Sequence, residues 1–186
     1  MALFYLIRHG EPDYSKLPEI GFWGFGRAFA PLSEQGIQQA EETAGDVRLK
    51  NAELIVSSPY TRALQTASII SGKIDLPINV EMDLHEWIPD KTNQNRTAEE
   101  AAMLNDEFIQ YRGIYPPGKQ MRWETVNEMR TRMRRVADKY ADYEKVIFVG
   151  HGMAFRTLAR IEQMKPAEIV ECVYERGEAE CEYSFC

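Results

Sequence analysis

The chain has 186 residues, of which 44% are hydrophobic and 27% charged, and its net charge is −7. These values are typical of a soluble globular protein, and we expect residues 1–186 to form a single domain. The negative charge disfavours binding to nucleic acid or an anionic membrane surface. No apolar stretch approaches the roughly 20 residues of a membrane-spanning helix, so we expect neither kind of partner.

The first residues and the cysteines both favour a cytoplasmic protein. The first apolar run is short and lacks a basic leader, which does not resemble a signal peptide. The cysteines lie near the C-terminal end, at Cys172, Cys181 and Cys186. Their odd number and spacing predict reduced thiols, and a Cys172–Cys181 bridge is the alternative.

The first predicted element is a buried strand at residues 2–8. This run is apolar, rich in β-favouring residues and without helical spacing. The strand ends in Arg8-His9-Gly10, where the missing side chain of Gly10 allows the backbone to turn. The long loop that follows, residues 11–31, contains proline, glycine and aromatic residues, and we expect it to pack over the end of the strand.

The rest of the chain predicts alternating helices and strands. Helices are expected at residues 34–49, 59–71, 97–111, 122–141 and 153–163. Strands are expected at residues 52–58, 78–84 and 145–150. Two more, at residues 169–174 and 181–185, predict a C-terminal hairpin. The alternation implies an α/β fold in which helices cover both faces of a mostly parallel central sheet.

One face of the predicted helix at residues 122–141 is rich in arginine. Its members are Arg130, Arg132, Arg134 and Arg135. Because the protein as a whole is acidic, we interpret these residues as a solvated face and not as a nucleic-acid patch.

Charged residues follow the ends of four predicted strands. They are Arg8, His9, Arg62, His85, Glu86 and His151. All three histidines of the chain are among them. Because the carboxyl ends of parallel strands meet at one edge of a sheet, we expect these side chains at one site.

This set of side chains suits phosphoryl transfer. The guanidinium groups of Arg8 and Arg62 bind phosphate oxygens through paired hydrogen bonds. A neutral His9 ring can attack phosphorus, and we expect its other N–H to donate to a backbone carbonyl near Gly10. His151 would donate to the phosphoryl oxygens. Glu86 would protonate the leaving alkoxide and then activate a water molecule.

Other interpretations apply to some members of this set. A zinc site of His9, Glu86 and His151 is chemically conceivable, but neighbouring arginines would repel the metal. Glu86 by itself reads as a surface carboxylate. We expect His85 to be structural or to lie at the rim of the site, since strand alternation turns it away from Glu86.

Several segments together resemble the histidine phosphatase superfamily, the phosphoglycerate mutase-like proteins. They are Leu6–Glu11, Leu32–Ala40, Ser57–Ala67, Leu84–Glu86 and Gly150–Arg156. The resemblance implies an α/β sandwich, a phosphohistidine at His9, and a phosphate pocket of Arg8, Arg62 and His151. It further implies Glu86 as the proton donor and neither metal nor other cofactor.

The chain departs from the family pattern at two positions. Ser15 stands where many members have asparagine and remains a candidate phosphate ligand, and Phe29 stands where many have aspartate. The chain is shorter than typical phosphoglycerate mutases, which favours a phosphomonoesterase. Phosphoglycerate mutase-type phosphotransfer and a non-catalytic phosphate-binding module are the alternatives.

The expected substrate walls, residues 20–29 and 88–118, contain few cations. These are Arg27, Lys91, Arg96 and Arg112. We therefore expect a small phosphorylated substrate with one phosphate and some apolar surface. The sequence leaves a monomer and a homodimer open.

Overall fold

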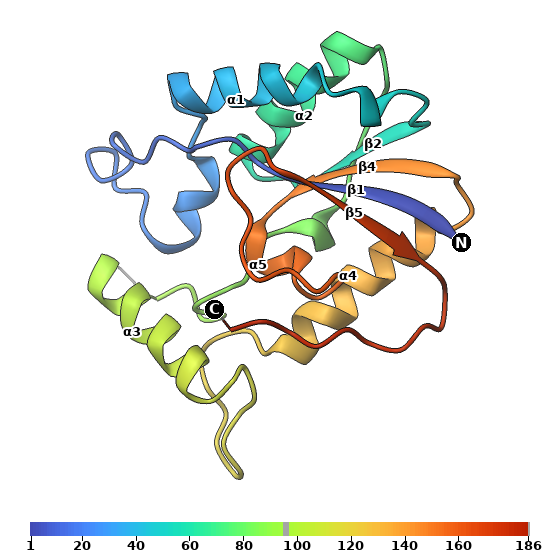
Figure 1. Cartoon of the computed structure of the whole chain (residues 1–186). Helices are drawn as coiled ribbons and strands as arrows, with labels where there is room; N and C mark the ends of the chain where they lie inside the picture. Colours follow the sequence, from blue (N-terminus) through green and yellow to red (C-terminus); the bar gives the residue numbers. More distant parts are fainter. Residues whose placement is uncertain (95–96, 186) are drawn as a thin grey trace.

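A five-stranded sheet forms the centre of the computed structural model, which describes residues 1–94 and 97–185 (Figure 1). The strand order is β3-β2-β4-β1-β5. The strands are β1 Ala2–Arg8, β2 Leu54–Ser57, β3 Ile78–Val80, β4 Lys145–Gly150 and β5 Ile169–Tyr174. The first four pair in parallel, and β5 pairs antiparallel to β1 at the edge. The prediction of a mostly parallel sheet is confirmed.

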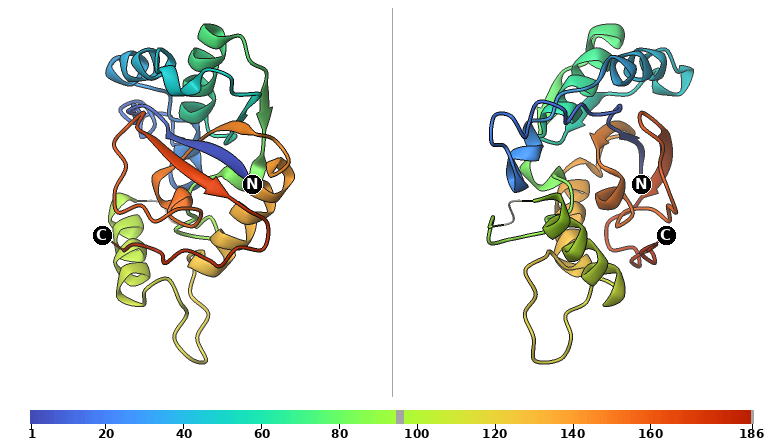
Figure 2. Two further views of the ribbon diagram at one scale, coloured as in Figure 1. Left: turned by 45° about the vertical axis from the view of Figure 1, so that its right-hand side comes forward. Right: turned by 90° about the vertical axis from the view of Figure 1, so that its left-hand side faces the viewer.

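Helices cover both faces of this sheet, as the alternating pattern predicted (Figures 1 and 2). The helices are α1 Glu34–Ala44, α2 Thr61–Ile74, α3 Ala98–Gln110, α4 Val126–Tyr140 and α5 Gly152–Phe155. Three 3₁₀ turns are η1 Gly24–Phe29, η2 Val47–Leu49 and η3 Met82–Leu84. Along β1, Phe4 and Leu6 pack into the core below the sheet, while Tyr5 and Ile7 pack into the core beneath α2. No described helix is long and apolar enough to cross a membrane.

Side-chain caps explain where several helices begin. The Ser33 hydroxyl accepts a hydrogen bond from the Gly36 N–H at 3.0 Å, and Thr97 accepts one from Glu100 at 3.2 Å. At α4, Thr125 and Glu128 form a reciprocal capping box, so this helix starts later than the sequence predicted. Each cap satisfies a backbone donor that the first helical turn leaves free.

Three predicted elements differ in the structure. The helix expected from Pro59 starts at Thr61, although the Ser58 hydroxyl accepts a hydrogen bond from the Tyr60 N–H at 3.3 Å and also bonds to His151. The strand expected to run to residue 84 ends at Val80, and η3 follows. The helix expected at residues 153–163 is limited to α5, which ends at Phe155.

The predicted C-terminal hairpin is wrong, because residues 181–185 form no strand. The rings of Tyr183 and Phe185 instead lie 6.1 and 5.7 Å from that of Phe108, which draws the segment against α3. Burial of these aromatic rings replaces strand pairing with β5. Cys172 and Cys181 are free thiols, as predicted, and Cys186 lies outside the described residues.

The solvated arginine face is also wrong at two positions. Arg132 is buried and bonds to Glu124, and the Arg130 side chain is only 11% exposed, whereas Arg135 is largely exposed. Arg132 lies three residues after the buried Met129 and four before the buried Val136, so it shares their face of α4.

Candidate active site

The carboxyl ends of the central parallel strands meet at one edge of the sheet. The His9 N–H donates to the Gly150 carbonyl at 2.9 Å, and the Ser58 N–H donates to the Val149 carbonyl at 2.9 Å. The backbone hydrogen bonds between strands thus continue one residue past the ends of β1 and β2, and they hold both of these ends against β4. Functional side chains at these exits are positioned by backbone pairing deep in the fold.

His9 is held as a neutral ring. Its Nδ1 lies 2.7 Å from the Gly10 carbonyl, which can only accept, so Nδ1 carries the proton. Its Nε2 accepts a hydrogen bond from Arg62 Nε at 3.0 Å. Burial and the Arg62 charge lower the pKa of His9 to about 3, against the opposing effect of the Gly10 bond. The predicted bond to a backbone carbonyl near Gly10 is therefore present.

The turn after His9 is fixed by backbone contacts. The Gly10 N–H donates to the Thr66 hydroxyl at 3.1 Å, and that hydroxyl donates to the Arg62 carbonyl at 2.8 Å. A Cβ at Gly10 would lie 2.4 Å from the Gly36 carbonyl oxygen. Only glycine allows the strand exit to approach α1 so closely.

His151 is fully buried beside His9, with 5.1 Å between the ring centres. Its Nε2 lies 2.8 Å from the Ser58 hydroxyl, and its Nδ1 lies 3.5 Å from Arg62 Nη2. Burial and the Arg62 charge lower the pKa of His151 well below its usual value. Arg62, itself buried, therefore bridges two neutral imidazoles.

Arg8 lies beside Gly152, the residue after His151. Its Cδ and Nε are 3.7 and 3.8 Å from where a Cβ on Gly152 would lie. One terminal nitrogen, Nη1, donates to the Met164 carbonyl. Its buried Nε has no hydrogen-bond partner among residues 1–94 and 97–185. A buried guanidinium N–H of this kind is suited to receive an anion.

Glu86 lies on the segment that follows η3. Its carboxylate accepts backbone N–H bonds from Trp87 at 2.8 Å, Ala154 at 3.1 Å and Met153 at 3.3 Å. The last two donors belong to α5, so Glu86 is tied to the element that begins next to His151. The half-buried His85 bonds through Nδ1 to the Glu86 carbonyl at 2.7 Å, which fits the structural role predicted for it.

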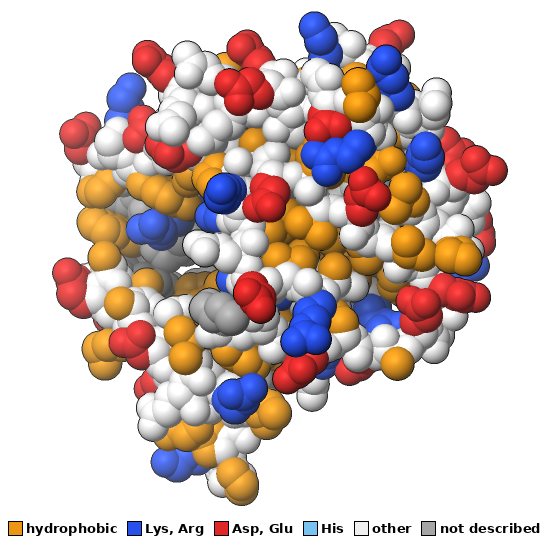
Figure 3. Space-filling model, viewed as in Figure 1, with side chains coloured by type: hydrophobic (Ala, Val, Ile, Leu, Met, Phe, Trp, Pro, Cys, Tyr) orange, Lys and Arg blue, Asp and Glu red, His pale blue; other side chains and the backbone are white. Residues whose placement is uncertain are grey.

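A cavity of about 200 Å³ opens over Arg62 and Glu86. One wall comes from the long loop and η1, as predicted, and the other from residues 86–90 and Asn93. Figure 3 shows it as a hollow with hydrophobic side chains on its rim. The aromatic lining consists of Tyr14, Phe25, Tyr60 and Trp87. This lining is suited to an apolar leaving group.

Few of the predicted wall cations reach the cavity. Arg27 lines it and stacks at 4.1 Å over the ring of Tyr14. Lys91 pairs with Glu128 at 2.8 Å, and Arg112 stacks over Phe185 at 5.1 Å. Neither is among the lining residues, and Arg96 lies outside the described residues.

Ser15 is not brought to the site, in contrast to its role as a candidate ligand. It is exposed, its N–H donates to Asp13 at 2.8 Å, and it does not line the cavity. Ser58 and Thr66 also contact the site, although the sequence predicts no role there for either. The place of Ser58 at the end of β2, beside β4, is the signal that could have put it near His151.

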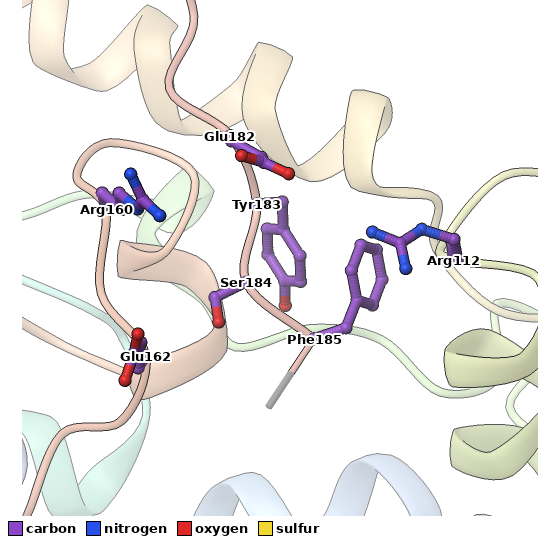
Figure 4. A pocket seen from close by; sticks show the side chains of 7 residues that line it. All are labelled: Arg112, Arg160, Glu162, Glu182, Tyr183, Ser184 and Phe185. Carbon is purple, nitrogen blue, oxygen red and sulfur yellow. The ribbon is translucent and has the colours of Figure 1, made fainter.

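Two further observations concern a second pocket and possible metal binding. A larger pocket of about 400 Å³ lies between Arg112, Arg160 and the C-terminal segment, and none of the candidate catalytic or phosphate-binding residues lines it (Figure 4). Among the residues that the structure describes, no three or more His, Cys, Asp or Glu are grouped to hold a metal ion.

The chain is similar to curated proteins over most of its length. The uncharacterized phosphatase PhoE of Bacillus subtilis is 30% identical over 158 residues, which cover 85% of this chain and 76% of that protein. The probable phosphoglycerate mutase GpmB of Proteus mirabilis is 27% identical, over 85% of this chain and 73% of its own length.

Solved structures share the fold. Bacillus stearothermophilus YhfR aligns with a TM-score of 0.70 and 23% identity, covering 95% of this chain and 93% of its own. A mycobacterial glucosyl-3-phosphoglycerate phosphatase aligns with a TM-score of 0.69 and 21% identity, covering 91% and 89%. The profile of the histidine phosphatase superfamily (branch 1) matches residues 4–177. The chain therefore belongs to the histidine phosphatase superfamily.

Proposed function

We propose that this phosphatase hydrolyses a small phosphate monoester through a phosphohistidine on His9, without a metal ion. One observation carries the proposal. The Nδ1 proton is fixed on the Gly10 carbonyl, so the Nε2 lone pair is directed at Arg62, a natural phosphate ligand. The ring is neutral, as a nucleophile must be.

In the first step, the incoming phosphate takes the place of the contact between Arg62 and His9. Its oxygens accept hydrogen bonds from Arg62 and Arg8, and His151 stabilises their negative charge. Nε2 forms a bond to phosphorus as the P–O bond to the leaving group breaks. Glu86 gives its proton to the leaving alkoxide.

In the second step, the Glu86 carboxylate takes a proton from water. The water oxygen bonds to phosphorus, the P–N bond breaks, and its electron pair returns to Nε2 of His9. Inorganic phosphate leaves, and Glu86 is again protonated for the next cycle.

The cavity supports a substrate with one phosphate and a small apolar portion. Aromatic rings dominate its lining, and Arg27 is its single cation besides Arg62 in the part of the chain that is described. A phosphatase named in the comparisons acts on glucosyl-3-phosphoglycerate, and GpmB relatives are named probable phosphoglycerate mutases. The mutase reaction is therefore the second candidate.

The test measures phosphate release from an aryl phosphate by the purified protein, with and without a chelator. We expect turnover that the chelator leaves unchanged. His9→Ala should abolish both turnover and acid-labile phosphate labelling of the protein, and Ser15→Ala is the matched control that retains both. Normal turnover by His9→Ala contradicts the mechanism. Interconversion of 2- and 3-phosphoglycerate, with bisphosphoglycerate added, tests the mutase alternative.

A further inference from the structure

The segment that carries Glu86 is irregular and needs external support. It follows the single turn of η3, and residues 85–88 are neither helix nor strand. A proton donor must be held within about half an ångström of its productive position. The turn η3, which leads into this segment, packs against α4.

The side chain of Arg132, on α4, binds the main chain of this segment. Its Nη1 donates to the carbonyls of Asp83 at 2.6 Å and His85 at 2.7 Å, and its Nη2 donates to the Glu86 carbonyl at 3.3 Å. The guanidinium is planar, so these three carbonyls are fixed relative to one another.

Glu124 fixes Arg132 in turn. Its carboxylate accepts from Arg132 Nε at 2.6 Å and from Nη2 at 3.0 Å, a paired arrangement between two buried side chains. The same carboxylate accepts from the Ile88 N–H at 3.2 Å. The Glu124 main chain also bonds to Ile88 at 2.9 Å and to Trp87 Nε1 at 2.8 Å. Glu86 is therefore held on its N-terminal side by Arg132 and on its C-terminal side by Glu124.

The cost of burying this pair argues for a role beyond stability. When two charges are buried, the hydration free energy that they lose is often as large as the free energy gained from their attraction. Proteins in which apolar side chains replace such a pair are therefore often equally stable. The three carbonyls could be satisfied by water in an exposed loop. What Arg132 and Glu124 add, and water would not, is a fixed position for the backbone of Glu86.

We propose that Arg132 and Glu124 are positioning residues for proton transfer by Glu86. This proposal rests on the proposed function, because it assumes that Glu86 protonates the leaving group. Neither residue lines the cavity or touches the reacting atoms. Their effect should therefore appear only where proton transfer to the leaving group limits the rate.

The test compares kcat/KM for an aryl phosphate, whose leaving group needs little protonation, and an alkyl phosphate, whose leaving group needs it fully. General acid catalysis contributes about 10²- to 10⁴-fold. We expect Arg132→Met to lower kcat/KM by roughly 10- to 100-fold for the alkyl ester and by less than about threefold for the aryl ester. Arg134→Met, on the same helix, is the control and should change neither, because Arg134 bonds to the Glu178 carbonyl at 2.6 Å and not to this segment.

Two more variants keep the test decisive. If Arg132→Met does not fold, Arg132→Lys keeps the charge but loses the planar fork, and should show the same selective loss. Glu86→Gln should show the selective loss in larger measure. Equal losses for both esters in folded Arg132 variants, or no loss, would overturn the positioning role. Equal losses in Glu86→Gln would instead refute the acid role of Glu86 and hence the proposed function.

Discussion

Acid should destabilise this protein through its buried neutral histidines. The pKa of His9 is about 3 in the folded protein, against 6.5 for an ordinary histidine. Between these pH values the unfolded chain binds more protons than the folded one, so the free energy of unfolding falls as pH falls from 6.5 towards 3. Stability from this group is fully present above pH 6.5. The pKa of His151 is lowered as well, so it acts in the same direction.

The size of the effect follows from the shift at His9. A pKa shift from 6.5 to about 3, at about 1.4 kcal/mol per pH unit, corresponds to a total loss of roughly 5 kcal/mol in the free energy of unfolding. Domains of this size are stable by about 5–15 kcal/mol, so the loss from one residue is a large fraction of the total.

The assay is urea unfolding at several pH values from 7.5 to 4.5, in buffers without phosphate. We expect the slope of unfolding free energy against pH in His9→Asn to be shallower than in the parent by up to about 1.4 kcal/mol per unit. Arg62→Met should also reduce the slope. The Arg62 charge helps to lower the pKa of both rings, so its removal brings both pKa values closer to that of an ordinary histidine. Equal slopes in the parent and His9→Asn would refute the reasoning.

Three further changes test the packing around the site by chemical denaturation. Ser58→Ala removes the partner of His151 Nε2 and should cost about 1–3 kcal/mol, and an unchanged midpoint would contradict this. Gly36→Ala should destabilise the protein although alanine favours helices, because its Cβ would lie 2.1 Å from the Glu11 carbonyl oxygen. Gly72→Ala in α2 meets nothing within 4 Å and should stabilise by up to about 1 kcal/mol, and the same sign for both glycines would rule out the steric explanation.

Much of the fold and the grouping of the site residues followed from local patterns. The apolar run before Arg8 predicted β1, and the charged residues after each strand predicted a common edge. His9, Arg62 and His151 do contact one another there. The bond from His9 to the Gly10 carbonyl also followed, because a neutral ring beside arginines needs its proton fixed.

The errors arose where distant contacts decide the structure. The run at residues 181–185 has the composition of a strand, but its aromatic rings pack against Phe108. Ser58 and Pro59 have the pattern of a helix start, but α2 begins at Thr61, and the Ser58 hydroxyl also bonds to the distant His151. Arg132 was grouped with its neighbours by charge, although helical spacing to Met129 and Val136 would have placed it inside. Its partner Glu124 carries no signal in the sequence alone.

The strand order has a consequence for how the protein folds. β1 leads into the candidate nucleophile His9 and is made before β4 and β5, yet Leu3 pairs with Lys145 and Val173, about 140 and 170 residues later. Contacts between such distant residues require the closure of long loops and slow the folding reaction. Until β4 and β5 emerge from the ribosome, β1 is an unpaired apolar edge that is prone to aggregation. The edge of the sheet that carries the candidate site can thus be completed only after β4 has been made.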